Sequence, residues 1–171
     1  AEALGLRLIK RDSRCLQCHY TSQIKREQEK AISGVSCESC HGAAADWINL
    51  HNDYGGATWD TESEAHRNQR IAASKQAGML RPSEIYEVVA NCYDCHLVPN
   101  EELVNKGGHS TGSAFALLDR LEQIRHNFLQ SYLRGDGTEN AERPIEHRRV
   151  MYVVGRALDL EYSLRGMAKA R

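Results

Sequence analysis

Apolar residues recur at helical spacing in several stretches, most of which end at a helix breaker. A helix is predicted over residues 62–79, ending near Gly78. A second opens at Pro82, a first-turn position, and runs into Cys92. A third follows Ser113, an expected N-cap, and breaks at residues 135–137. Its expected apolar face comprises Phe115, Leu118, Leu121, Ile124, Phe128, Leu129 and Tyr132.

A short helix is expected over residues 43–50, and the longest one over Ile145 to Ala170, directly after Pro144. Five positions of this last helix fall near heptad spacing and form a heptad stripe. They are Val150, Val154, Ala157, Glu161 and Leu164, with Leu158 alongside. The helix either packs across the rest of the molecule or pairs with a second copy of the chain. Because no stretch reads as a β-strand, the sequence predicts a mostly α protein, with residues 1–171 as one domain.

Composition narrows the classes of protein. The chain has 171 residues, enough for one domain with a core. Its net charge of -1 gives no reason to expect nucleic acid or an anionic membrane as partner. Mean hydropathy is -0.58, and no apolar run is long enough to span a membrane. Aromatic residues make up only 6%, too few to fill an ordinary core.

The six cysteines form three pairs, and a histidine directly follows the second member of each pair. The segments are Cys15-Leu16-Gln17-Cys18-His19, Cys37-Glu38-Ser39-Cys40-His41 and Cys92-Tyr93-Asp94-Cys95-His96. Cys-x-x-Cys-His is the attachment signature of c-type haem. Its thiols bond to the two vinyl groups of one porphyrin, and the adjacent His gives the iron its proximal nitrogen. The sequence therefore predicts three covalently bound haem c groups.

Other uses of Cys-x-x-Cys fit this pattern less well. A zinc site would need paired Cys-x-x-Cys units, and three units leave one unpaired. A redox dithiol would occur once, near a βαβ pattern that is not visible. Neither these uses nor a disulfide framework explains a His after every second cysteine.

Three haems would change how the core is built and where the protein resides. Each porphyrin is a large flat apolar surface, which accounts for the scarcity of aromatic side chains. We expect helices and loops wrapped around the haems, and a poorly folded chain without them. Because bacteria attach haem to cysteine outside the cytoplasmic membrane, a periplasmic or otherwise exported protein is expected. Any signal peptide has then been removed or lies outside this sequence, which opens Ala1-Glu2-Ala3.

Five histidines remain to supply the sixth ligand of three irons once His19, His41 and His96 are proximal. Exposed haem irons compete for any imidazole in reach. The predicted distal ligands are His51, His109, His126 and His66. His147 stands beside Arg148 and is expected to mark a solvated helix start.

The stretch Gly34-Val35-Ser36-Cys37-Glu38-Ser39-Cys40-His41-Gly42, followed by His51, resembles the tetrahaem cytochrome c-554 family. That family is related through its haem arrangement to hydroxylamine oxidoreductase and pentahaem nitrite reductase. The resemblance covers roughly residues 12–100. It implies that His51 ligates a different, earlier haem. The chain departs from the family in having three attachment segments rather than four, since the first segment and the His that follows it are missing.

Two classes of function remain open. If histidine fills both axial positions, no substrate reaches the iron, and the protein is an electron carrier that serves redox partner proteins. Ligation by two histidines also favours a lower reduction potential of the haem than ligation by His and Met. If one haem is five-coordinate, the protein is a redox enzyme or small-ligand sensor of the nitrogen-oxide or hydroxylamine type. Candidates for polar groups above such an iron are Arg67, Arg125, Tyr93 and Tyr132. The surplus of histidines favours electron transfer over an enzyme.

Overall fold

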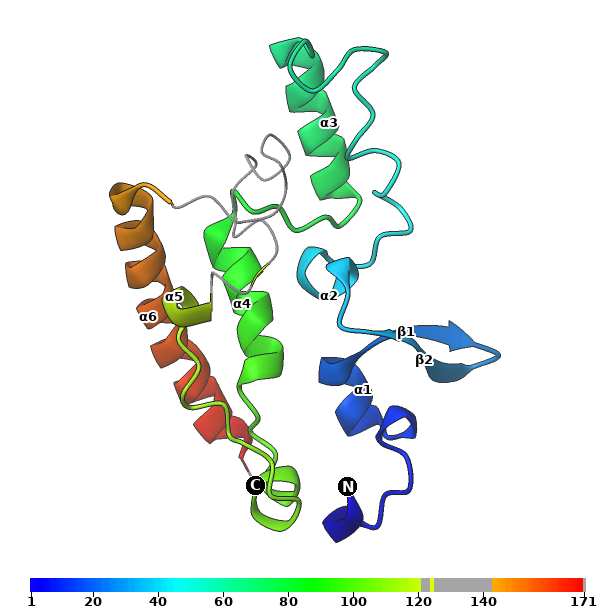
Figure 1. The fold of residues 1–171 in the computed structure, drawn as a ribbon, viewed down its shortest axis with the longest axis vertical. Helices are drawn as coiled ribbons and strands as arrows, with labels where there is room; N and C mark the ends of the chain where they lie inside the picture. Colours follow the sequence, from blue (N-terminus) through cyan, green and yellow to red (C-terminus); the bar gives the residue numbers. More distant parts are fainter. Residues whose placement is uncertain (121–123, 125–142, 171) are drawn as a thin grey trace.

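The computed structural model describes residues 1–120, 124 and 143–170 (Figure 1). In this part of the chain helices predominate, as predicted from the sequence. The main elements are α1 (Ser13–His19), β1 (Tyr20–Lys25), β2 (Gln28–Gly34), α2 (Cys37–His41), α3 (Glu64–Gln76), α4 (Ile85–His96), α5 (Leu117–Arg120) and α6 (Ile145–Lys169). A single π-turn, η3 (Glu102–Lys106), follows α4, and two short 3-10 turns, η1 (Glu2–Leu4) and η2 (Ile9–Arg11), precede α1.

The apolar core lies where α4, α5 and α6 meet. Figure 1 shows α4 and α6 side by side, with α1, the hairpin and α2 beyond α4. The buried core residues are Val88, Val89, Tyr93, Phe115, Leu117, Met151 and Leu158. Tyr93 also donates a hydrogen bond from its hydroxyl to the Gly155 carbonyl (3.1 Å), which ties α4 to α6 inside the core.

The predicted last helix is confirmed, and the face that it buries within the chain is not the heptad stripe. Met151 and Leu158 are fully buried, whereas Val150 is 51% exposed and Leu164 is 57% exposed. The reason is close packing at Gly155, where a Cβ atom would lie 3.1 Å from the Cβ of Leu117. This contact turns the face that contains Gly155 toward the core and leaves the predicted heptad positions partly in solvent.

A β-hairpin connects α1 to α2, although the sequence predicted no strand. Strands β1 and β2 pair antiparallel, from Tyr20 opposite Gly34 to Lys25 opposite Gln28. Arg26 and Glu27 form the turn with φ values of 53° and 62°. Such two-residue turns usually carry Asn-Gly or another glycine pair, so this one gave no recognisable turn signal.

Three other predicted boundaries shift. Residues 43–50 form successive turns rather than a helix. Pro82 precedes α4, whose N-cap is Glu84, because the chain turns once more before the helix begins. The helix expected after Ser113 starts only at Leu117. Its continuation through Phe128 and Tyr132 lies outside the described residues.

The N-terminal part has very little apolar core of its own. Within residues 1–84, all of which are described, the only buried hydrophobic residues are Leu16 and Trp47. An isolated two-stranded hairpin is also only marginally stable in water. The contacts among residues 1–84 therefore do not by themselves supply an ordinary hydrophobic core. Of the helices that the structure describes, none has the length and apolar character needed to cross a bilayer.

Candidate functional site

Each of the three Cys-x-x-Cys-His segments lies at the end of a helix. We call Cys15–His19 site 1, Cys37–His41 site 2 and Cys92–His96 site 3; they end α1, α2 and α4. In each case the histidine is the last helical residue. Two cysteines three positions apart on a helix face the same side. The histidine follows at the point where the chain leaves the helix, so both thiols and the imidazole can approach one ligand.

Local sequence explains why the first two of these short helices form. The Asp12 side chain caps α1 by accepting a hydrogen bond from the backbone N–H of Arg14 (3.0 Å). Ser36 and Ser39 form a reciprocal capping box at the start of α2. Such caps satisfy backbone N–H groups that a helix of five to seven residues could not otherwise pair.

Site 3 lies between the other two sites. The Cys18 thiol lies 4.0 Å from the Asp94 carbonyl oxygen, and the Cys95 thiol lies 3.8 Å from the Gln17 carbonyl oxygen. On the other side of site 3, the Asn91 side chain donates a hydrogen bond to the Ser39 carbonyl (2.6 Å). All three sites therefore form one cluster, with site 3 in the middle.

The thiols of this cluster are electrostatically distinct. A hydrogen bond from Cys95, and then the nearby His109 imidazole, lower the pKa of Cys18 to about 7. Burial raises the pKa of Cys92 to about 11, with a smaller contribution from Cys40. All six cysteines are described, and none is in a disulfide. They are therefore free to bond to another group.

The proximal candidate of site 2 has one ring nitrogen fixed. His41 Nδ1 donates to the Leu80 carbonyl at 2.8 Å, and the Leu80 N–H donates to the His41 carbonyl at 3.0 Å. The chain can approach this closely because Gly42, at φ 80°, has no Cβ, which would lie 2.7 Å from the Gly78 carbonyl oxygen. Metal-binding histidines commonly donate their second ring nitrogen to a carbonyl in this way. With the proton on Nδ1, the lone pair of the His41 ring is on Nε2, which is the nitrogen that would bind a metal.

The proximal candidate of site 3 is packed against the core. The His96 ring stacks on Phe115, with centroids 4.4 Å apart and planes 17° apart. Burial, and then the charge of Arg120, lower the pKa of His96. A lowered pKa favours the neutral imidazole, which is the form that binds metals. The sequence gave no sign of the role of Phe115, because the contact joins residues on separate elements.

His109 lies beside site 1. Its ring centroid is 6.0 Å from that of His19, with an angle of 72° between the planes. Its Nδ1 donates to the Ser110 carbonyl (2.8 Å), which leaves Nε2 free of that contact. Of the predicted distal ligands that the structure describes, His109 is the one that lies next to a proximal histidine.

The other spare histidines lie in different surroundings. His51 Nδ1 donates to the Ile48 carbonyl (2.7 Å), and His66 Nδ1 contacts the Glu62 carboxylate (2.8 Å). Arg143 Nη1 lies 2.5 Å and 2.9 Å from the two ring nitrogens of His147. The predicted ligand His126 lies outside the described residues, as does Arg125. The Tyr93 hydroxyl, considered above as a group over an open iron, is instead bonded within the core.

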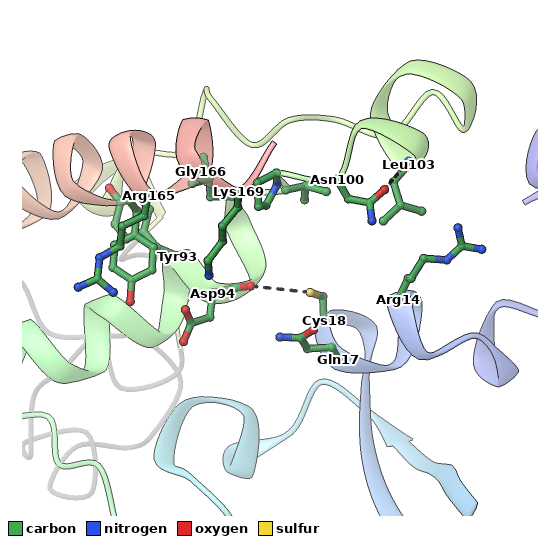
Figure 2. A pocket seen from close by; sticks show the side chains of 14 residues that line it. Arg14, Gln17, Cys18, Tyr93, Asp94, Asn100, Leu103, Arg165, Gly166 and Lys169 are labelled. Atoms are coloured by element: carbon green, nitrogen blue, oxygen red, sulfur yellow. Dashed lines mark hydrogen bonds between the residues drawn. The ribbon is translucent and has the colours of Figure 1, made fainter. Parts of the chain in front are cut away.

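A cavity of about 340 Å³ opens beside Cys18 (Figure 2). Three cationic side chains line it: Arg14, Arg165 and Lys169. Arg14 pairs with Asp12 (2.8 Å), and Arg165 pairs with Glu161 (2.6 Å). Lys169 makes no ion pair with a described residue; Figure 2 shows it extending from the end of α6 toward Asp94. Sequence reasoning missed Arg165 and Lys169, because α6 contains no attachment segment.

The described residues fit a covalently bound haem. They offer a thiol pair beside a histidine three times. The indole Nε1 of Trp47 is buried without a hydrogen-bond partner among described residues, and an acidic propionate could accept from it. No group of three or more His, Cys, Asp or Glu in the described residues is arranged to hold a metal ion. A haem iron takes four ligands from its porphyrin and needs only two from the protein.

Comparison with known proteins supports this class. Residues 3–42 match the family model "Cytochrome c554 and c-prime", which supports a c-type cytochrome with covalent haem. The match includes sites 1 and 2, and it ends before His51 and site 3. No curated protein and no solved structure matches the chain. A cytochrome of this class transfers electrons by means of its haem.

Proposed function

We propose that the chain is a trihaem c-type cytochrome that carries electrons between redox partner proteins. The observation that carries this proposal is the clustering of three Cys-x-x-Cys-His segments, each at the end of a helix, with site 3 in contact with site 1 through Cys95 and Gln17. When bound, each haem supplies an iron that alternates between its ferric and ferrous states.

The chain's own residues attach and orient these groups. Cys15 with Cys18, Cys37 with Cys40, and Cys92 with Cys95 would form the thioether bonds. His19, His41 and His96 would be the proximal ligands. The protein then sets the potentials through ligand identity, hydrogen bonding to those ligands and burial. For His41, the bond to the Leu80 carbonyl fixes the ring and makes Nε2 a better donor.

We further propose that most of the irons have histidine on both sides. Two imidazoles on opposite faces of one iron have ring centres about 6 Å apart, because metal–imidazole bonds are about 2 Å long. The separation of His19 and His109 agrees with this value. His109 is therefore the proposed distal ligand of site 1, and His51 is proposed for another site. The sequence also predicts His126 and His66 as distal ligands, and of these two we propose His126.

The surroundings of the protein are also part of the proposal. We propose a periplasmic or otherwise exported location, because that is where bacteria attach haem to cysteine.

The side chains of Val153, Leu160 and Leu164 on α6 are 65%, 64% and 57% exposed. Their exposure leaves α6 available for a homodimer, which sedimentation of the holoprotein would detect.

Three measurements on the purified holoprotein test the proposal. The intact mass should contain three haem increments, and ferric EPR should show low-spin signals only. The ferrous protein should bind carbon monoxide slowly or not at all. A mass with fewer increments would contradict the trihaem assignment. A high-spin ferric signal with rapid binding of carbon monoxide would instead support a five-coordinate site and catalysis or sensing.

A further inference from the structure

A buried ion pair outside the three sites joins Glu62 to α3. Arg70 donates from Nε to Glu62 Oε1 (2.7 Å) and from Nη2 to Oε2 (2.6 Å). The Glu62 side chain is fully buried, and that of Arg70 is 8% exposed. Burying charges costs free energy that the pair itself often fails to recover. The ion pair is therefore better explained by what it holds in place than by its stability alone.

The Arg70 guanidinium uses its remaining nitrogen to hold the segment that contains His51. Its Nη1 donates to the His51 backbone carbonyl at 2.5 Å. The same guanidinium lies over the Tyr54 ring, 4.7 Å from the centroid. Arg70 is a residue of α3. Two of its guanidinium nitrogens bind Glu62, and the third binds the segment 51–54, so Arg70 connects this segment to α3.

The His51 ring is held by two further contacts. A carbonyl can only accept a hydrogen bond, so the contact with the Ile48 carbonyl places the proton on His51 Nδ1. The ring also packs edge-on against Trp47, with centroids 5.3 Å apart, and Trp47 is only 3% exposed. These contacts select the tautomer whose Nε2 lone pair can bind iron.

His66 belongs to the ion-pair cluster itself. Its Nδ1 contacts the same Glu62 oxygen that Arg70 Nε binds. Its Nε2 faces the backbone at Gly55, where a Cβ atom would lie only 2.7 Å away. Both ring nitrogens therefore lie close to protein groups, whereas His51 Nε2 makes no hydrogen bond with a described residue.

We propose that Arg70, held by Glu62, is a positioning residue that orients His51 as an axial haem ligand, and that His66 supports Glu62 rather than binding iron. This inference rests on the proposed function, because it requires His51 to ligate a haem. It predicts that the loss of the Arg70 guanidinium loosens one iron–His51 bond without removing any ligand.

The test uses the holoprotein and the substitution Arg70→Met, with Arg67→Met as the matched control. Arg67 lies on the same helix, but its side chain is 46% exposed and its Nε is 3.7 Å from Glu62. In Arg70→Met, one haem of the three should acquire ferric high-spin signal and bind carbon monoxide when reduced. Added imidazole should restore the low-spin spectrum, and a far-ultraviolet circular dichroism spectrum equal to that of the wild type should show that the fold is kept. Arg67→Met should keep the wild-type spectrum.

Two histidine variants assign the ligand. His51→Ala should produce the full high-spin change, and His66→Gln should leave all three haems low-spin. An Arg70→Met protein with three low-spin haems and unchanged potentials would overturn the proposal, as would an unchanged spectrum in His51→Ala. A high-spin haem in His66→Gln would overturn the part that concerns His66.

A second variant distinguishes the loss of an iron–His51 bond from a failure of the protein to fold. Glu62→Gln keeps the size of the side chain and removes its charge, so it should give a partial high-spin fraction. If neither Arg70→Met nor Glu62→Gln binds three haems, the ion pair serves folding alone and the proposal is wrong. A wild-type protein without three haems would instead contradict the proposed function, whatever the variants show.

Discussion

The imidazole rings of His19 and His109 lie with their centres 6.0 Å apart, although His19 ends α1 and His109 follows η3. The segment after η3 is brought there by backbone contacts. His109 N–H donates to the Leu103 carbonyl (3.0 Å), and Val98 N–H donates to the Thr111 carbonyl (3.0 Å). The same segment passes so close to site 3 that a Cβ on Gly112 would collide with the His96 carbonyl.

The first prediction concerns this pair of rings. His109→Ala should leave the site 1 iron with one protein ligand, so one haem should become high-spin and bind carbon monoxide. His109→Met should keep six ligands and raise the potential of that haem, because thioether ligation favours the ferrous state. EPR and a redox titration measure both effects. His147→Gln is the control, since the Arg143 guanidinium lies against its ring; a low-spin His109→Ala protein would remove His109 from the ligand set.

The second prediction concerns the cavity beside Cys18. Lys169 is a cation without an ion-pair partner among described residues, and it should stabilise the acidic propionates of a haem held there. Removing a positive charge disfavours the electron-rich reduced state. Lys169→Gln should therefore lower one reduction potential by ~10–40 mV, since an exposed ion pair contributes ~0.2–1 kcal/mol. Spectroelectrochemical titration measures the shift, and Lys25→Gln, at the end of β1, should cause none.

The third prediction compares two leucines of α6. Leu158 is fully buried in the core, and Leu164, which belongs to the heptad stripe, is 57% exposed. Leu158→Ala should lower the free energy of unfolding by about 2–5 kcal/mol through the cavity it leaves. Leu164→Ala should change it by less than about 0.5 kcal/mol. Thermal unfolding of the holoprotein measures both; equal losses would mean that the heptad face is the buried one.

The fourth prediction concerns acid. Hydrogen bonds from Arg70, and then from His66, lower the pKa of Glu62 to about 2, from 4.5 for an unperturbed side chain. A lowered folded-state pKa stabilises the protein above the unfolded value and loses that stabilisation as the pH falls from about 4.5 toward 2. Glu62→Gln should remove this part of the pH dependence. Unfolding measured between pH 6 and 2, with Glu64→Gln on the exposed start of α3 as control, tests it.

Local sequence signals account for the elements that were predicted correctly. The attachment segments depend on contiguous residues, and α6 follows Pro144 as a long stretch without a breaker. The β-hairpin was missed because Arg26 and Glu27 adopt a turn that usually requires glycine or asparagine. The buried face of α6 could not be read from the heptad stripe, because it depends on contact between Gly155 and Leu117.

The candidate site was predictable only where its chemistry is local. The thiol pairs and their adjacent histidines could be read from spacing alone. By contrast, the approach of His109 to His19 depends on how η3 and the following turn pack. The ion-pair cluster of Glu62, His66 and Arg70 could not be foreseen either, because two of its members looked like solvated charges on a polar helix.

The uneven distribution of the apolar core bears on how such a protein matures. Residues 1–84 bury only Leu16 and Trp47 as hydrophobic side chains, whereas α4, α5 and α6 enclose a packed centre. During biogenesis, the thiols of sites 1 and 2 would remain accessible to the attachment machinery, because nothing apolar closes over them beforehand. Porphyrin insertion would then be the event that ends the accessibility of the N-terminal segment, for instance to proteases.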